Sequence, residues 1–530
     1  MKHLNQEQVS SDQSHLRGEK SSLKKIGSFF VIGCLLAGSF MTSAAYADGV
    51  TSSSSISSSS KSYYISPTGS DSNPGNISAP FKSLMKAQSV ASPGDTVYIR
   101  SGVYDDFTSA ETDNTYHYVN DFTKSGITYE AYPGDQRPVF DFKNVPTDRR
   151  VAAFFIDPSA TGLTFKGFDV IGVKAGDQKQ SEAFNIRGNA NFENMAAHDN
   201  EANGFYFNVH GSGTVINSDS YNNIGPNPIN AGNTDGFGAH GDDVTFINDR
   251  AWHNSDDGFD SITSNGTVIY DHDWSFNNQG NQNGIGDQNG FKVGGYAYLT
   301  NENRKYIPDQ VPVHTVKYCL SVNNGANGFY ANHQPGQSAN WTNNTAYNNG
   351  VHSGANFNML ERVSPTDINN IPGYREVLHN NIAYMGTSII NDNNPAENVT
   401  NNSWLIDGGL NITSKDFVSL DMSQLSAPRK PDGSLPDISF MRPVPTSPIY
   451  KYGLGYLADQ DPVISLQELV TSFTQDGKID NDGIANSLQM KLKNHDLSSF
   501  INEIDAQSGK HIDKETANYL SQEANALITQ

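Results

Sequence analysis

Three aspartates, Asp256, Asp257 and Asp260, lie within five residues of one another in an Asp-Asp-Gly-Phe-Asp run. Asp235 stands before an earlier Gly-Phe, and Lys292 follows a later one. Four carboxylates within a few ångströms cannot all stay ionised unless a cation neutralises them, and carboxylate-only clusters suit hard cations, above all Ca²⁺. These segments therefore predict one site, a calcium cage beside a basic residue that could act as nucleophile or base.

Two interpretations of this cage remain open on spacing alone. In one, calcium only joins neighbouring segments, and Lys292 forms a surface salt bridge with Asp260. In the other, calcium binds a substrate carboxylate, and its charge lowers the pKa of Lys292 so that a neutral amine removes a carbon-bound proton. On a uronate, calcium would acidify the C5 hydrogen, and loss of the C4 glycosidic oxygen would complete a β-elimination.

The cage belongs to a repeat that runs from about residue 191. Each repeat of this phrase begins with four positions, which are Ala or Ser, any residue, a polar residue and Asn. A turn of variable length follows, and the repeat ends with Asn or Asp, then Gly, then Phe. Successive Gly-Phe pairs are 32, 22, 32 and 38 residues apart, and about 22 residues make one coil of a parallel β-helix. We predict an all-β protein built on a parallel β-helix, since the fixed register argues against a β-propeller or a sandwich.

Stacking of the coils predicts the geometry of the site. Equivalent positions on neighbouring coils lie about 4.8 Å apart. One row holds the residues before Gly-Phe, which are Asn203, Asp235, Asp257, Asn289 and Asn327. A second row holds the residues after Phe, which are Tyr206, Gly238, Asp260, Lys292 and Tyr330. We therefore expect the four carboxylates and the lysine to share one patch over three coils, with the repeated Asn side chains hydrogen-bonded from coil to coil and the repeated Phe side chains stacked inside.

The ends of the sequence differ from the repeat. Residues 1–47 are predicted to be a signal peptide, because two lysines precede an apolar run that ends near Ala-Tyr-Ala, and residues 48–62 are predicted to be a serine-rich linker. We assign residues 63–455 to the β-helix catalytic domain and expect an amphipathic helix at 79–87 to cap its open end. Apolar spacing in residues 465–530 predicts a small C-terminal module of about three helices.

Composition limits the partners of the protein. The apolar run is short for a membrane anchor, and a loose lipobox before Cys34 is a second alternative to export. Cleavage after Ala47 would leave Cys319 as the one cysteine, so we expect a secreted monomer without an internal disulfide. The 57 acidic and 35 basic residues disfavour nucleic acid or an anionic membrane as partners, and any polyanionic substrate would be repelled unless cations were supplied at the site.

The segment 233–295 resembles the family 9 polysaccharide lyases, which are calcium-dependent pectate lyases on a right-handed parallel β-helix. The resemblance rests on Asp-Gly-Phe, on Arg-Ala-Trp-His-Asn-Ser-Asp-Asp-Gly-Phe-Asp and on Asn-Gly-Phe-Lys-Val-Gly-Gly, and it extends over residues 63 to 450. It implies cleavage of polygalacturonate with Lys292 as proton acceptor and with four calcium ligands, Asp235, Asp256, Asp257 and Asp260. The C-terminal module is similar to helical modules of secreted Gram-positive enzymes that have been proposed to hold polysaccharide or cell-wall material.

Two other functions on the same fold remain as alternatives. Asp235 followed by Asp256 and Asp257 also resembles the inverting polygalacturonases, although the Gly-His-Gly and Arg-Ile-Lys motifs of that family do not occur downstream. A non-catalytic, polysaccharide-binding β-helix adhesin is the third possibility. Endo or exo action, methyl-ester tolerance and the identity of the uronan are not fixed by the sequence. Candidates for binding substrate carboxylates, or else solvated loop charges, are Arg304, Lys305, Arg362 and Arg375.

Overall fold

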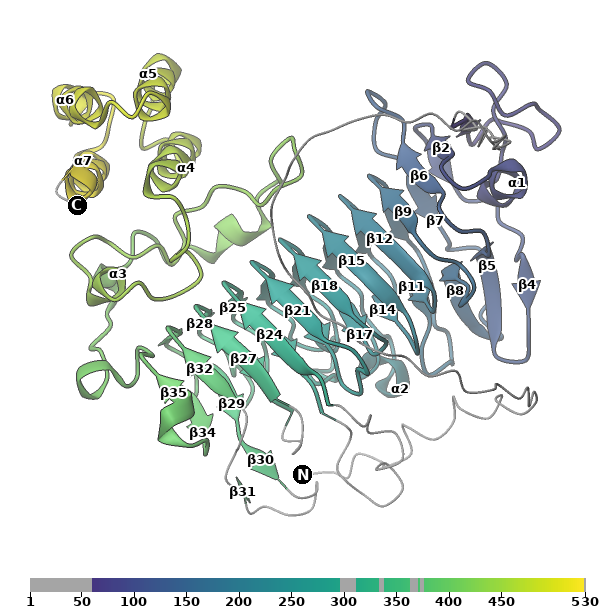
Figure 1. The fold of residues 1–530 in the computed structure, drawn as a ribbon, viewed down its shortest axis with the longest axis horizontal. Coiled ribbons are helices and arrows are strands. Elements are labelled where there is room, and N and C mark those ends of the chain that lie inside the picture. Colours follow the sequence, from purple (N-terminus) through teal and green to yellow (C-terminus); the bar gives the residue numbers. More distant parts are fainter. Residues whose placement is uncertain (1–59, 296–310, 333–337, 363–369, 372–375, 529–530) are drawn as a thin grey trace, which may run out of the picture. The chain divides into compact units, whose positions relative to one another are not determined.

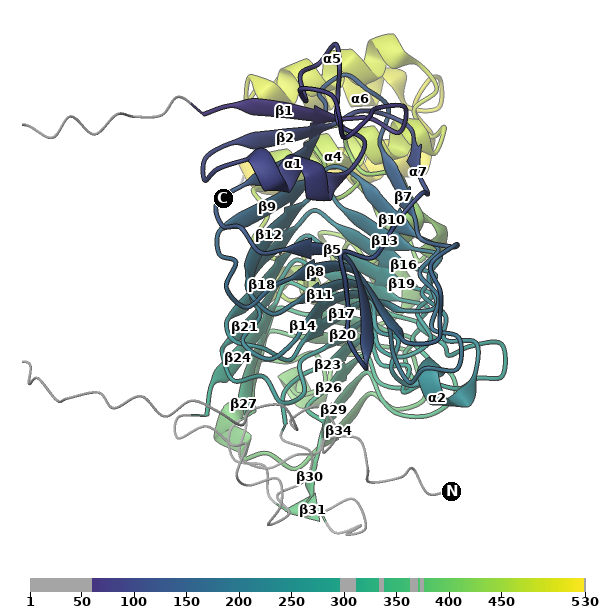
Figure 2. The same ribbon diagram turned by 90° about the vertical axis from the view of Figure 1, so that its right-hand side faces the viewer.

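The computed structural model describes residues 60–295, 311–332, 338–362, 370–371 and 376–528. The predicted signal peptide and the linker up to residue 59 lie outside these residues. Within the described chain, short strands follow one another around successive coils and pair in parallel with the equivalent strands of the next coil (Figures 1 and 2). The prediction of a parallel β-helix is confirmed.

Three long sheets run along the coils. The first sheet consists of β1 (Ser62–Ile65), β2 (Thr96–Ile99), β6 (Thr128–Ala131), β9 (Leu163–Lys166), β12 (Asn189–Glu193), β15 (Ser212–Ile216), β18 (Val244–Ile247), β21 (Val268–Asp271), β24 (Val313–Lys317), β27 (Ser338–Thr342), β32 (Val377–His379) and β35 (Val399–Thr400). The second sheet consists of β3 (Val103–Tyr104), β7 (Val139–Asp141), β10 (Asp169–Ile171), β13 (Ala196–His198), β16 (Asp219–Tyr221), β19 (Arg250–Trp252), β22 (Trp274–Phe276), β25 (Leu320–Val322), β28 (Thr345–Tyr347) and β33 (Ile382–Tyr384).

The third sheet carries the repeated Gly-Phe positions. Its strands are β4 (Glu111–Thr112), β5 (Tyr116–Phe122), β8 (Arg150–Ile156), β11 (Glu182–Ile186), β14 (Asn203–Phe207), β17 (Phe237–Ala239), β20 (Phe259–Asp260), β23 (Phe291–Lys292), β26 (Phe329–Tyr330), β29 (Phe357–Met359) and β34 (Ile390–Asp392). The β4–β5 pair is antiparallel, as is a separate hairpin of β30 (Glu361–Arg362) and β31 (Asn370–Ile371). All the other pairings in the three sheets are parallel among the described strands.

The Asn-turn-Gly-Phe phrase explains why the coils stack in one register. Inside the coil, the rings of Phe237, Phe259 and Phe291 stack in parallel with centroids 4.8 Å apart. At the turn between the second and third sheets, Asn254 Nδ2 donates to Asn278 Oδ1 at 3.2 Å, and Asn278 Nδ2 donates to the next ladder residue at 3.0 Å. The predicted Phe stack and Asn ladder are therefore both confirmed.

The position before each ladder asparagine bends the chain. It adopts a left-handed backbone with φ between 53° and 56°, which costs Asn, Asp and His less than most other residues. This explains the polar residue that the phrase carries at that position. The residues concerned are Asp199, Asn222, His253, Asn277, Asn323 and Asn348.

A capping helix lies at the N-terminal end of the coils, as predicted, but it is α1 (Leu84–Val90) and begins later than residue 79. The Ser83 side chain accepts from the backbone N–H of Lys86 and so fixes the start of the helix. The preceding chain is held extended by the bond from Phe81 N to Tyr64 O. Gln88 is buried and its amide donates to Asp121 O at 2.8 Å, so the helix satisfies backbone groups that the open coil end exposes.

After β35 the chain turns back over the second sheet. A short helical turn, η2 (Ala396–Asn398), precedes β35 directly, and the C-terminal segment after β35 contains η3 (Ile406–Gly408), η4 (Ser414–Asp416), η5 (Met422–Ser426) and α3 (Pro448–Lys451). A further short helix, α2 (Pro228–Ala231), lies in the coil before β17. Apolar side chains of the segment, including Leu425, Phe440 and Tyr456, cluster with Trp274 and Phe276 of β22. The segment therefore gives the second sheet an apolar cover.

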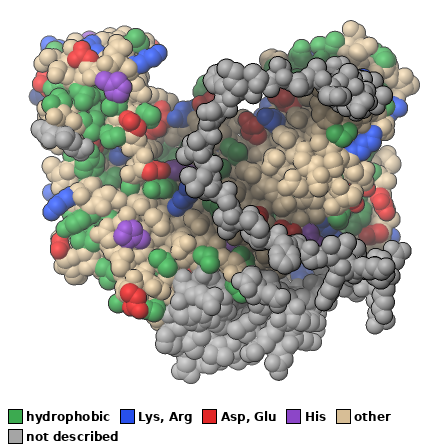
Figure 3. Space-filling view, viewed as in Figure 1, with side chains coloured by type: hydrophobic (Ala, Val, Ile, Leu, Met, Phe, Trp, Pro, Cys, Tyr) green, Lys and Arg blue, Asp and Glu red, His purple; other side chains and the backbone are tan. Residues whose placement is uncertain are grey.

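The C-terminal module contains four helices rather than about three: α4 (Pro462–Gln475), α5 (Asp482–Lys493), α6 (Leu497–Gln507) and α7 (Lys514–Ile528). The fourth was missed because small or polar residues surround its buried Ala517, Leu520 and Ala524. Acidic, basic and apolar side chains are interspersed on the face of the module seen in Figure 3. None of the helices in the described chain combines the length and apolar character that a membrane span requires.

Candidate active site

The site lies on the outer face of the third sheet, where β17, β20 and β23 are adjacent (Figure 2). Gly238 pairs with Asp260, and Asp260 pairs with Lys292. Because the stacked Phe of each strand faces the interior, the next residue faces outward. The row that the repeat predicts, from Tyr206 through Lys292 to Tyr330, is confirmed in the same register.

Asp235 and Asp257 occupy positions that asparagine fills on neighbouring coils. Asn289 donates to Asp257 Oδ1 from both its backbone N–H and its side-chain amide, each at 2.8 Å. Asp257 N donates in turn to Asp235 Oδ1 at 3.1 Å, and Asp235 N donates to Asn203 Oδ1. An ionised carboxylate has no hydrogen-bond donor, so the side chain of an aspartate cannot donate to the next residue of such a ladder. Among the described residues, Asp257 Oδ2 is buried, accepts no hydrogen bond and forms an ion pair with Lys292.

The other carboxylates converge on the same place. Asp235, Asp256 and Asp257 each place an oxygen within 4.8 Å of the others, and Asp235 and Asp260 come equally close together with a nitrogen of His240. The four aspartates are at most 5% exposed. The structure therefore brings together all four residues that the sequence predicted, and all of them are buried.

The electrostatics of the cluster favour a bound cation. Burial, followed by repulsion from Asp260 and Asp257, raises the pKa of Asp235 well above its usual range. Burial, followed by repulsion from Asp287 and Asp257, does the same to the pKa of Asp256. Buried carboxylates of this kind keep their charge only when positive charge is placed among them. An oxygen-rich donor set with unpaired lone pairs fits Ca²⁺.

Lys292 is the amine inside this cluster. Its Nζ lies 3.1 Å from Asp257 Oδ2, 3.1 Å from Asp260 Oδ2 and 3.0 Å from Asp287 Oδ2, and the residue is 8% exposed. The pair with Asp260 exists, but it is not the surface salt bridge of the simpler interpretation. Burial lowers the pKa of Lys292, and the three carboxylates outweigh it, so the pKa lies well above its usual range. The lowering predicted from the sequence would require a cation among the carboxylates.

Two residues of the cluster were missed from the sequence. Asp287 pairs with Lys292, and its backbone N–H donates to Asp256 Oδ1 at 2.5 Å. It lies in the variable turn before Asn-Gly-Phe, where the repeat predicts no register. His240 directly follows the end of β17 and lies two residues after Gly238, so counting the alternation of strand side chains one position further would have placed it on the same side as Gly238.

The predicted basic contacts to substrate lie elsewhere. Arg304, Lys305 and Arg375 are outside the described residues, as is the side chain of Arg362. That these four residues contact substrate carboxylates therefore stays a prediction.

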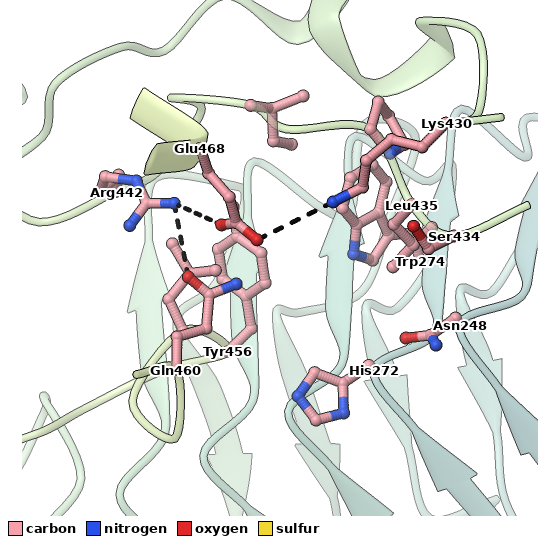
Figure 4. Close-up of a pocket in the computed structure, with 13 residues that line it drawn as sticks. Asn248, His272, Trp274, Lys430, Ser434, Leu435, Arg442, Tyr456, Gln460 and Glu468 are labelled. Carbon is pink, nitrogen blue, oxygen red and sulfur yellow. Dashed lines mark hydrogen bonds and ion pairs between the residues drawn. The ribbon is translucent and has the colours of Figure 1, made fainter. Parts of the chain in front are cut away.

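A separate cavity of about 180 Å³ lies where the C-terminal segment and α4 meet the second sheet (Figure 4). Its wall includes Trp274 and His272 from the β-helix and Tyr456 from the C-terminal segment. Of the charged groups drawn in Figure 4, Glu468 pairs with Arg442 at 3.3 Å and with Lys430 at 4.0 Å. This cavity shares no residue with the acidic cluster.

Known proteins share this arrangement of coils. The Pel9A-like right-handed β-helix region matches residues 63–381. Pectate lyase L of Dickeya chrysanthemi is 31% identical over 388 residues, which cover 72% of this chain and 83% of that protein. Among solved structures, a rhamnogalacturonan lyase is 35% identical with a TM-score of 0.64, covering 75% of this chain and 100% of its own. Pectate lyase Pel9A is 28% identical with a TM-score of 0.54, covering 74% and 91%.

Proposed function

The chain belongs to the Pel9A-like family of right-handed parallel β-helix polysaccharide lyases, and on that premise we propose that it cleaves a galacturonate-containing polysaccharide by calcium-dependent β-elimination. The observation that carries the proposal is the place of Lys292, whose Nζ lies 3.1 Å from oxygens of both Asp257 and Asp260. A calcium that only joined coils would not need a buried amine among its carboxylates.

In this proposal Asp235, Asp256, Asp257 and Asp260 hold Ca²⁺. This assignment is supported by the burial that they share, by the raised pKa of Asp235 and Asp256, and by the buried Asp257 Oδ2, which accepts no hydrogen bond from any residue that the structure describes. When bound, Ca²⁺ supplies positive charge that holds the uronate carboxylate and stabilises the negative charge that develops beside it.

Lys292 serves as the base. In its neutral form the Nζ lone pair takes the proton from C5 of the uronate, and the C–H electron pair forms the C4–C5 double bond. The bond from C4 to the glycosidic oxygen breaks, and the departing oxygen takes a proton from solvent. Asp257, Asp260 and Asp287 hold the amine in place from three sides, which fixes the direction from which it approaches C5.

Two substrates fit this chemistry, because each supplies galacturonate at the cleaved bond. Polygalacturonate is supported by the pectate lyase relatives, whereas a rhamnogalacturonan backbone is supported by the solved rhamnogalacturonan lyase, which is the more similar of the two structures compared. We propose polygalacturonate first, as the acidic polysaccharide for which a calcium cage on a net negative protein is best suited, and rhamnogalacturonan as the second candidate.

The experiment follows the ultraviolet absorbance of the unsaturated product on each polysaccharide, with Ca²⁺ and with a chelator. We expect absorbance to rise on one of the two only when Ca²⁺ is present. Lys292→Ala should abolish the signal while the fold is kept. Lys292→Arg should do the same, because a guanidinium stays charged and cannot take a proton.

The control is Lys166→Ala, which removes a lysine of β9 on the first sheet that pairs with Glu193 at 2.6 Å. This variant should keep full activity. New reducing ends without the absorbance would instead indicate hydrolysis, and binding without cleavage of either polysaccharide would indicate an adhesin.

We also propose that the protein is secreted and that its C-terminal module contacts polysaccharide or cell-wall material. Secretion is supported by the apolar run followed by Ala-Tyr-Ala at 45–47, and a polysaccharide or wall contact by the similarity of the helical module to those of secreted enzymes. N-terminal sequencing of protein from the culture medium should begin at Asp48. A chain that retained residues 1–47 would contradict the predicted cleavage.

A further inference from the structure

A histidine occupies the gap that a glycine leaves in the outward row of the third sheet. Gly238 stands between Tyr206 and Asp260 in that row. A Cβ at Gly238 would lie 2.9 Å from His240 Nε2 and 2.9 Å from Tyr206 Cδ2. The imidazole packs against the Tyr206 ring with centroids 4.9 Å apart. The glycine therefore leaves room for His240 to reach the acidic cluster.

The hydrogen bonds of this histidine fix its tautomer. Nδ1 lies 2.8 Å from the backbone oxygen of Ile262, and a carbonyl oxygen only accepts, so Nδ1 carries the hydrogen and Nε2 presents a lone pair. The backbone N–H of Ile262 donates to Asp260 Oδ1, also at 2.8 Å. One residue of the turn thus orients both His240 and Asp260.

The lone pair of His240 is presented beside the carboxylates of the acidic cluster. Nε2 is buried and has no hydrogen-bond partner among the described residues. A ring nitrogen of His240 lies within 4.8 Å of a carboxylate oxygen of Asp235 and of Asp260, and those two oxygens are equally close to each other. We take this nitrogen to be Nε2, because Nδ1 is already engaged by the backbone oxygen of Ile262. Three acceptors in a buried position repel one another unless a cation or a proton lies between them.

We infer that His240 Nε2 is a nitrogen ligand on the Asp235–Asp260 side of the metal cage, so that the cage takes borderline divalent ions of the Mn²⁺ to Ni²⁺ series as well as Ca²⁺. The inference rests on the proposed metal cage but not on the substrate. An imidazole nitrogen is a poor ligand for Ca²⁺ and a good one for later first-row ions, whose affinity rises from Mn²⁺ to Ni²⁺ at sites with nitrogen donors.

The first test measures metal binding to the full chain by calorimetry, without any polysaccharide. His240→Gln should weaken Ni²⁺ binding by about tenfold or more and change Ca²⁺ binding far less. The matched control is His379→Gln, an exposed histidine of β32 on the first sheet, which should leave both affinities unchanged. Equal loss of both ions in His240→Gln, or no loss of either, would overturn the inference.

The second test starts from the wild-type protein, so its main result does not depend on a variant that might misfold. Pulsed electron paramagnetic resonance of the wild-type protein with one equivalent of Mn²⁺ should detect coupling to a histidine ¹⁴N, and His240→Gln should remove it. Bound Mn²⁺ without nitrogen coupling in the wild type would overturn the inference and would favour a proton held between His240 and Asp235. A wild type that shows the coupling yet cleaves neither polysaccharide would sink the proposed function while leaving His240 as a ligand.

Discussion

At the scale of single residues, the site replaces two amides of a side-chain ladder with carboxylates. Asn327 donates to Asn289, and Asn289 donates to Asp257 Oδ1, each at 2.8 Å. At Asp257 the chain of amide donors ends, because both side-chain atoms are acceptors. Burial raises the pKa of Asp257 to about 7, even though Lys292 acts in the opposite direction. An aspartate in place of the ladder asparagine at position 257 therefore provides a metal ligand and also lowers the stability of the coil.

Asp257→Asn tests this trade between binding and stability. The new amide restores a donor and removes a buried charge, so the free energy of unfolding in a chelator should rise by about 1 kcal/mol. Calcium affinity should fall by at least about tenfold, and turnover should be lost with it. Urea denaturation and calorimetry measure the two effects. A variant that is less stable than the wild type in the chelator would contradict the argument.

Asp287→Asn tests the positive charge on Lys292. The base must be neutral to act, and the pKa of Lys292 is raised by Asp257, Asp260 and Asp287, against the lowering caused by burial. Activity should therefore increase with pH through the alkaline range in the wild type. Removal of the Asp287 charge lowers this pKa, so the rising limb of the kcat/KM profile should move toward lower pH. An unchanged limb would indicate that another group limits the reaction.

At the scale of elements, most of what the sequence predicts about the coils and the site follows from the repeat. Each coil repeats a left-handed polar residue, a ladder Asn and an interior Phe, so the register of Asp235, Asp257, Asp260 and Lys292 follows from counting. The parts that escaped prediction have no such constraint. Asp287 lies in a turn of variable length, and α7 has too few large apolar residues for its spacing to show.

Asn278→Ala tests how much the ladder contributes. Its side chain is fully buried, its Oδ1 accepts from Asn254 N at 2.9 Å, and its Nδ2 donates to Asn324 Oδ1 at 3.0 Å. Alanine leaves these partners unsatisfied inside the coil, so the free energy of unfolding should fall by about 3 kcal/mol. Asn265→Ala, at an exposed position, should change it by less than about 0.5 kcal/mol. Urea titrations in which the two variants behave alike would refute the role given to the ladder.

At the scale of the whole described chain, polar contacts connect the C-terminal segment to the β-helix. Asp219 of β16 binds Arg250 of β19 at 2.9 Å and Arg429 of the segment at 2.8 Å. Arg250 also donates to the backbone oxygens of Leu425 and Ala427. The sequence gives no sign of these contacts, because the segment lies after the repeat and the partners are about two hundred residues apart, as in the 210 between Asp219 and Arg429.

His272 makes this connection sensitive to the alkaline pH that the proposed chemistry favours. It binds Asp271 at 2.7 Å and Asp459 of the segment at 3.2 Å, and these carboxylates raise its pKa to about 9 although burial acts to lower it. A raised pKa stabilises the fold fully below the unfolded-state value of about 6.5, and that contribution is lost as pH rises through about 9.

His272→Gln should therefore be less stable than the wild type by on the order of 1 kcal/mol near neutral pH, because the side chain is partly exposed and solvent weakens the pair. The difference should shrink as pH rises and should vanish above about 9. Urea denaturation of both proteins across this range measures it. A difference that stayed constant with pH would mean that His272 stabilises the fold by packing on Tyr318 rather than by its charge.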